Sequence, residues 1–147
     1  MNLATFDQCI IDFSKHYGIL IARIAFFIVF FWFGILKVFG MSPANALVES
    51  LMESALPFLT FSQFIVLFGL FEMTIGILFL IPKYSRLVIP FFFLHMLTTA
   101  LPLFVLPSIT WQSFLVPTLE GQYIIKNLVL VSLAIVIIAQ LKPMRRT

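Results

Sequence analysis

Long apolar stretches are the main feature of the chain. Each has about the 20 helical residues needed to cross a hydrocarbon core of roughly 30 Å. Leu, Ile and Phe occur on every side of these stretches, whereas the strands of a membrane barrel would alternate polar and apolar residues. The pattern therefore predicts an all-α integral membrane protein, a bundle of four transmembrane helices at about 18–40, 61–81, 87–106 and 121–140.

The segment before the first span is amphipathic. Residues 3–17 carry apolar side chains at helical spacing, with polar side chains on the remaining surface. This pattern predicts an amphipathic helix that lies on the cytoplasmic face of the membrane. A simple cytoplasmic extension of the first span explains the pattern equally well, and the sequence leaves both alternatives open.

Two longer loops connect the spans at the opposite face. In the first loop, Ser42 and Pro43 form the start of a short predicted helix at 43–56. The second loop, 107–120, combines prolines with aromatic residues that suit the headgroup zone of a membrane. Thr118 at its end is expected to cap the fourth span.

Composition supports a membrane environment. Hydrophobic residues make up 62% of the 147 positions and charged residues only 10%, against about 25% charged in soluble domains. The net charge of +3 comes without a basic patch, so no nucleic-acid partner is expected. The single cysteine, Cys9, excludes dithiol exchange within one chain. With no repeat or linker, residues 1–147 are expected to form one domain, whose first span is too long for a cleaved signal peptide.

Basic residues are unevenly divided among the segments outside the spans. The loops 41–60 and 107–120 contain neither Lys nor Arg. The N-terminal segment, the loop between the second and third spans and the C-terminal tail hold Lys15, Lys83, Arg86, Lys142, Arg145 and Arg146. By the positive-inside rule, both termini are expected in the cytoplasm and both longer loops outside. We expect a multi-pass protein of a bacterial-type cytoplasmic (inner) membrane.

A carboxylate interrupts the second span near its middle. Glu72 lies within the stretch IVLFGLFEMTIGILFLI, where an acidic residue costs roughly 2.5–3.5 kcal/mol. Gly69 and Gly76 share its helical face, and glycines mark the close approach of a neighbouring backbone. Glu72 is therefore expected to face protein and not lipid. The sequence leaves its partner open among Arg23, Lys37 and Lys126.

Further polar residues accompany Glu72 on two other spans. Arg23 and Lys37 share one stripe of the first span, near its inner and outer ends, and Lys126 and Asn127 lie near the outer start of the fourth. These positions predict a cavity that opens outward, with Lys37, Lys126 and Asn127 at its rim and Glu72 at its floor. Arg23 is too near the inner side for this rim. It is expected to extend to the cytoplasmic headgroups or to bridge to Glu72.

The third span contributes one histidine. His95 lies near mid-depth and can reach the level of Glu72, while Pro102 further on predicts a kink. A lone histidine is more often a packing residue than a ligand. A haem would need a second histidine within the membrane, and His16 lies on the cytoplasmic side, so neither haem nor metal binding is expected. Glu72 and His95 are the catalytic candidates, for proton transfer.

Three stretches share their order and spacing with a known family. They are RIAFFIVFFWFGILKVFG in the first span, GLFEMTIGILFLIPKYSR in the second and EGQYIIKNLVLV in the fourth. Over about residues 18–140 the chain resembles the DoxX-like family of small four-helix membrane proteins. The third stretch is similar to the G-x-[FY]-[ILV]-[ILV]-K-[DN] motif of a branch that includes proteins linked to reactive-chlorine resistance.

The resemblance implies a function in redox chemistry or stress defence. The family is similar to the small, quinone-interacting subunit of a thiosulfate:quinone oxidoreductase, and other members are associated with oxidative-stress defence. Carried onto this sequence, the implied site falls on Arg23, Lys37, Glu72 and Lys126. The chain has no cysteine pair and no pair of haem ligands. Electron transfer would therefore need a quinone, a flavin or a partner subunit.

The leading hypothesis is a membrane subunit that binds a quinone and serves a redox or oxidative-stress system. Lys37 and Lys126 would bind the quinone carbonyls, and Glu72 or His95 would exchange the proton. The alternative is a non-catalytic scaffold or assembly factor, in which these residues only fix packing and depth. A proton-coupled transporter ranks last, because the four helices include no pair of broken ones. Besides the lipid bilayer, a membrane or redox partner protein and a homo-oligomer stay open.

Overall fold

The computed structural model describes residues 2–55 and 60–143, most of which lie in helices, and it includes one short hairpin. Four helical segments are long and apolar enough to cross a membrane. They are α1 (Leu3–Val38), α3 (Phe61–Leu80), the segment Pro82–Val105 and α7 (Leu119–Ala139). The four predicted spans are therefore present as helices of the required length.

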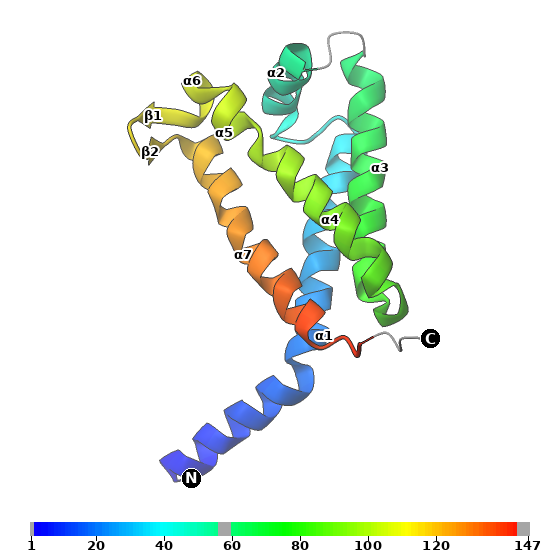
Figure 1. The fold of residues 1–147 in the computed structure, drawn as a ribbon, viewed down its shortest axis with the longest axis vertical. Coiled ribbons are helices and arrows are strands. Elements are labelled where there is room, and N and C mark those ends of the chain that lie inside the picture. Colours follow the sequence, from blue (N-terminus) through cyan, green and yellow to red (C-terminus); the bar gives the residue numbers. More distant parts are fainter. Residues whose placement is uncertain (1, 56–59, 144–147) are drawn as a thin grey trace.

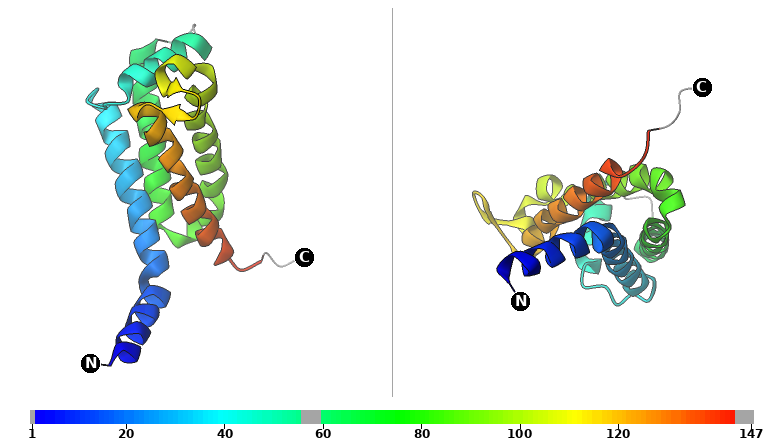
Figure 2. Two further views of the ribbon diagram at one scale, coloured as in Figure 1. Left: turned by 90° about the vertical axis from the view of Figure 1, so that its left-hand side faces the viewer. Right: turned by 90° about the horizontal axis from the view of Figure 1, so that it is seen from below.

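α1 is longer than the predicted first span. It runs for 36 residues as one helix, which is about 54 Å at 1.5 Å per residue. Its N-terminal part leaves the bundle at an angle (Figure 1 and Figure 2), and residues 3–17 are exposed there. The amphipathic segment is thus the first part of the same helix.

The third span consists of three helical pieces. A 3-10 turn, η1 (Pro82–Tyr84), leads into α4 (Ser85–Ala100), and α5 (Pro102–Val105) follows. Proline has no N–H with which to continue the helical ladder. Leu101 N–H instead donates to the carbonyl of Thr98 at 3.2 Å, and α4 ends there. The helix is thus interrupted next to Pro102, where the sequence predicts a kink.

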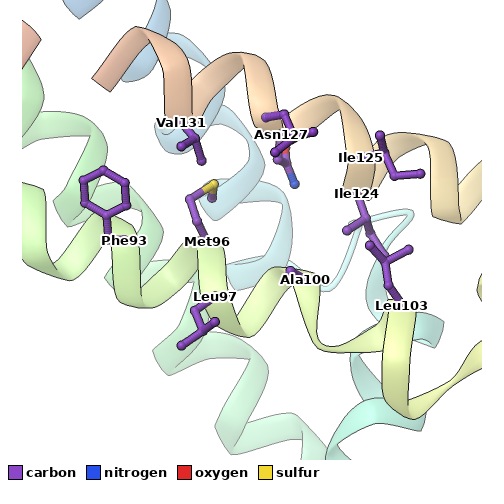
Figure 3. A pocket seen from close by; sticks show the side chains of 10 residues that line it. Phe93, Met96, Leu97, Ala100, Leu103, Ile124, Ile125, Asn127 and Val131 are labelled. Carbon is purple, nitrogen blue, oxygen red and sulfur yellow. The ribbon is translucent and has the colours of Figure 1, made fainter. Parts of the chain in front are cut away.

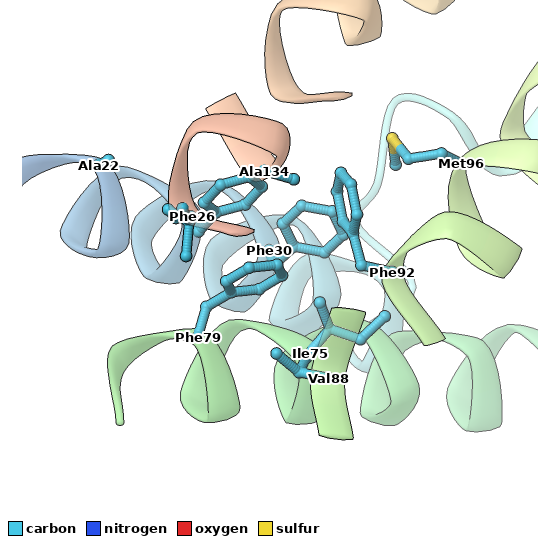
Figure 4. Close-up of a cluster of buried hydrophobic side chains, with 10 residues drawn as sticks. Ala22, Phe26, Phe30, Ile75, Phe79, Val88, Phe92, Met96 and Ala134 are labelled. Carbon is cyan, nitrogen blue, oxygen red and sulfur yellow. The ribbon is translucent and has the colours of Figure 1, made fainter. Parts of the chain in front are cut away.

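The helices pack as a ring in the order α1, α3, α4, α7, with α1 and α3 in contact along much of their length (Figure 1). Three phenylalanines join three of these helices in the core (Figure 4). The rings of Phe26 and Phe79 stack with centroids 4.1 Å apart, and Phe92 meets them edge-on at 5.3 and 5.4 Å. Such pairs contribute about 0.5–1.5 kcal/mol beyond the area they bury. The core therefore joins α1, α3 and α4 by specific aromatic geometry.

The two ends of the bundle differ in charge and in structure. One end, which we call the basic end, holds η1 and the end of α7, and there the guanidinium of Arg86 donates to the carbonyl of Lys142. The other end, the hairpin end, holds the loop helix α2 (Asn45–Ala55), α5 and α6 (Pro107–Thr110) (Figure 1). The loop helix predicted at 43–56 is thus present and begins at Asn45, and the end predicted at 56 lies outside the described residues.

A β-hairpin at the hairpin end has no counterpart in the sequence prediction. Strand β1 (Trp111–Ser113) pairs antiparallel with β2 (Val116–Pro117). The indole N–H of Trp111 donates to the carbonyl of Leu103 at 3.0 Å. Leu115 in the turn has a φ of 58°, which only a minority of non-glycine residues adopt. The loop between the third and fourth spans is therefore an ordered part of the fold.

Thr118 caps α7 as the sequence predicts. Its hydroxyl accepts a hydrogen bond from Gly121 N–H at 3.1 Å and donates to the carbonyl of Ile109 at 2.8 Å. We expect Thr118→Ala to lower the free energy of unfolding by about 1 kcal/mol, because both bonds are lost. Equilibrium unfolding in mixed micelles measures this.

Thr60 provides a matched control for the cap. It occupies the N-cap position of α3, but its side chain makes no capping bond to a backbone N–H. Thr60→Ala should therefore change the free energy of unfolding by much less than Thr118→Ala. Equal losses for the two variants would show that the Thr118 cap contributes nothing specific.

Candidate functional site

Glu72 lies in the contact between α1 and α3. A Cβ on Gly34 of α1 would lie 2.5 Å from the carbonyl oxygen of Gly69, and a Cβ on Gly69 would lie 2.6 Å from that of Gly34. Glycine at both positions lets the two backbones touch, and Glu72, one turn after Gly69, faces this contact. Its exposed fraction is 6%. The prediction that Glu72 faces protein is confirmed.

Lys37 is the partner of Glu72. Its Nζ atom lies 2.6 Å from Oε2 of the carboxylate, and both side chains are buried. Charge-assisted bonds of this length are about twice as strong as neutral ones. Of the three candidates that the sequence left open, the structure selects Lys37.

His95 completes the cluster from α4. Its Nε2 atom lies 3.3 Å from Oε1 of Glu72, and the residue is 4% exposed. An ionised carboxylate only accepts hydrogen bonds, so Nε2 carries the hydrogen that faces it. In the neutral ring Nδ1 is then a free lone pair, and this atom is buried with no hydrogen-bond partner in the described part of the chain. We call Lys37, Glu72 and His95 the buried triad. One of its hydrogen-bonding atoms, Nδ1 of His95, thus has no partner in the described part of the chain.

Aromatic rings surround the triad. The rings of Phe30, Phe68 and Phe71 have their centroids 5.4, 5.1 and 6.0 Å from that of His95. Nζ of Lys37 lies 5.6 Å from the centroid of Phe68. Such apolar walls lower the local dielectric constant, which strengthens the ion pair and makes an unpaired charge costly. The contact of Phe68 was not predicted, although its position one turn before Glu72 is visible in the sequence.

Arg23 lies apart from the triad. It precedes Lys37 by 14 positions on α1, about 21 Å along the helix. Its Nη1 atom donates to the carbonyl of Phe79 at 2.8 Å, in the last turn of α3. A cation is favoured at a helix C-terminus. Arg23 therefore fastens α1 to α3 near the basic end and does not bridge to Glu72.

Lys126 and Asn127 also separate from the triad. Lys126 is exposed, with its Nζ atom 5.1 Å from the ring centroid of Tyr123 on the same helix. Asn127 lines a groove between α4 and α7 (Figure 3). The structure therefore does not bring Lys126 and Lys37 together, and Asn127 belongs to a different site from the triad.

Two cavities in the described part of the chain are almost entirely apolar. The groove between α4 and α7 has a volume of about 360 Å³. A second cavity of about 410 Å³ lies on α1 around Trp32 and Phe39. No residue of the triad lines either of them. The residues predicted to surround one polar cavity are thus divided among the buried triad, an apolar groove and the exposed surface.

Comparisons with known proteins leave the site to be interpreted from its own chemistry. No protein-family model, curated protein or solved structure matches the chain. Within the described residues, no group of three or more His, Cys, Asp or Glu could hold a metal ion. The functional argument therefore depends on the triad and the groove.

Proposed function

We propose that the protein is a membrane subunit that binds a small molecule, with a quinone as the leading candidate, and serves a redox or oxidative-stress system. The observation that carries the proposal is the buried triad with its open Nδ1 atom. Ionisable residues inside a membrane bundle are expensive and as a rule functional. A lone pair fixed in place by Glu72 and Lys37 is suited to accept or return a proton.

The triad residues fit a quinone in distinct roles. A bound quinone would supply the electron-accepting chemistry, with carbonyl oxygens that take hydrogen bonds and protons. His95 is the proton-exchanging residue, because its Nδ1 atom has no hydrogen-bond partner among the described residues. Glu72 and Lys37 are positioning residues: Glu72 fixes the orientation of the ring, and Lys37 holds the carboxylate in place. Lys126, which is exposed, is left out of this arrangement.

The proposal includes a family and an orientation. The resemblance to the DoxX-like family supports a bacterial-type cytoplasmic membrane and a redox partner protein. The basic end, with Lys83, Arg86 and Lys142, faces the cytoplasm by the positive-inside rule. Both termini are then cytoplasmic, and the triad lies in the outer half of the bundle.

A non-catalytic scaffold or assembly factor is the second candidate. The observation that favours it is that Lys37 and Glu72 satisfy each other and line neither described cavity. In this function the triad fixes the register of three helices, and a partner protein binds elsewhere. The scaffold predicts a stable complex with another membrane protein and no retained quinone.

Replacing His95 with phenylalanine tests the proposal. Phenylalanine keeps a ring among Phe30, Phe68 and Phe71 but removes both nitrogens. We expect wild-type protein purified in native lipid to retain a quinone at about one per chain. The amount of quinone per chain should be about three- to tenfold lower in the His95→Phe protein, because one hydrogen bond is lost. Mass spectrometry of the extracted small molecules measures the ratio.

Lys126→Met is the matched control, because Lys126 is an exposed charged residue of the spans that lies over the ring of Tyr123 on its own helix. It should retain the wild-type amount of quinone. Bulk phospholipid alone in wild type and both variants would overturn the proposal in favour of the scaffold. Equal retention in wild type and His95→Phe would remove His95 from the site.

A further inference from the structure

We propose that the groove between α4 and α7 is the site where the isoprenoid chain of the ligand lies, entered sideways from the bilayer, and that the side-chain amide of Asn127 binds a carbonyl oxygen of its head group. This assignment rests on the proposed function for the quinone identity of the ligand. The groove and the amide themselves are observed independently of the triad. The residues that line the groove are distinct from those of the triad.

The groove has the size and lining of a ligand site. Its volume of about 360 Å³ falls within the range of about 300–1,000 Å³ for small-molecule sites. No charged residue lines it. Its walls are apolar side chains from both helices, among them Phe93, Met96, Leu97, Ile124, Leu128 and Val131 (Figure 3). The part of a ligand that fills the groove must therefore be uncharged and apolar.

Asn127 is the exception to this apolar lining. No hydrogen bond joins its side chain to any other residue in the described part of the chain, and Figure 3 shows it between the two helices opposite Met96 and Ala100. An amide in hydrocarbon without a partner costs several kcal/mol on alkane scales. Asparagines in membrane helices usually bond to a neighbouring helix. Here α4 presents apolar side chains to it, so a ligand is the partner that fits.

The depth of Asn127 selects the kind of ligand. It lies eight residues after Leu119, the first residue of α7, about 12 Å along the helix. Phospholipid ester groups lie at the edge of the hydrocarbon core and not that far within it. A carbonyl group at this depth belongs to a molecule whose head is itself apolar enough to enter the core, as a quinone ring is. Met96 of the groove directly follows His95 of the triad, so the groove and the triad take residues from the same stretch of α4.

Photo-crosslinking in lipid nanodiscs tests the site. The probe is a prenylated benzoquinone with a photoreactive diazirine in its chain, and a diazirine-bearing phosphatidylcholine is the comparison probe. We expect the quinone probe to label peptides of α4 and α7 saturably, and the lipid probe to label all four spans without saturation. Asn127→Leu should weaken quinone labelling about three- to tenfold, the effect of one hydrogen bond.

Two further variants separate the outcomes. Ala100→Leu adds bulk to the groove and should abolish labelling, whereas Ser132→Ala should leave it unchanged, because the Ser132 hydroxyl only bonds to the Leu128 carbonyl of its own helix. Equal labelling by the two probes would contradict the proposal that the groove binds the quinone chain. So would a lack of effect of Asn127→Leu and Ala100→Leu. If a retained quinone then still depends on His95, the proposed function stands without it. If even wild-type protein retains no quinone, both the proposed function and the groove site are contradicted.

Discussion

Replacing Glu72 with leucine is expected to lower the free energy of unfolding by about 3–5 kcal/mol. The substitution leaves the Lys37 ammonium buried at 6% exposure without the carboxylate that lies 2.6 Å from it. Removing one partner of a buried pair costs this much, because the remaining charge is uncompensated. It also removes the acceptor of the His95 ring N–H. Equilibrium unfolding in mixed micelles measures the loss.

The double variant Lys37→Met with Glu72→Leu gives the decisive comparison. Apolar replacement of both partners is often neutral or stabilising, so its free energy of unfolding should return to within about 1 kcal/mol of wild type. Lys126→Met, at an exposed lysine over Tyr123, should change it by no more than about 1 kcal/mol. If Glu72→Leu has no larger effect than Lys126→Met, the ion pair is not formed in the membrane. A stable double variant without bound quinone would tie the triad to binding and not merely to folding.

Gly69→Leu is expected to destabilise the protein by about 3 kcal/mol. The first atom of any side chain here would lie 2.6 Å from the carbonyl oxygen of Gly34 and 3.0 Å from Cβ of Lys37. Overpacking of a tight contact typically costs about 1–3 kcal/mol, and leucine is large for a site where even a Cβ collides with backbone. The displacement of α1 would also draw Lys37 away from Glu72. The same unfolding measurement applies, with retained quinone as the second readout.

Gly18→Ala is the control for this glycine. Gly18 lies within α1, and a Cβ added there would have nothing within 4 Å. Alanine in a helix interior is about 0.5–1 kcal/mol more favourable than glycine. Gly18→Ala should therefore leave stability unchanged or raise it slightly. A loss similar to that of Gly69→Leu would mean that the loss at Gly69 does not come from close approach of α1 and α3.

The features predicted from the sequence are those that depend on repetition along the chain. Apolar stretches of the length of a span identify the four long helices without any knowledge of packing. The face shared by Gly69, Glu72 and Gly76 predicts that the carboxylate faces protein and not lipid. Pro102 predicts the interruption of the third span for a purely local reason, the missing N–H.

The features that were missed depend on direction and on distant contacts. Successive residues of a helix point about 100° apart, so Lys126 and Asn127 diverge although they are adjacent, and only the packing of α7 decides which of them faces α4. The choice of Lys37 over Arg23 depends on the register between α1 and α3. The hairpin at 111–117 is held by contacts from outside it, including the bond from Trp111 to Leu103. Its strands are too short for their periodicity to be recognised.

The bond between Arg23 and Phe79 has a mechanical consequence. Three contacts join α1 to α3 at different heights along the helices: this bond, the contact of Gly34 with Gly69, and the pair of Lys37 and Glu72. α7 packs against α4 across an apolar groove, and the bond from Arg86 to the carbonyl of Lys142 joins them at the basic end. The contact between α1 and α3 is therefore the more closely fixed of the two. Both partners of the ion pair lie on α1 and α3, and neither lines the groove.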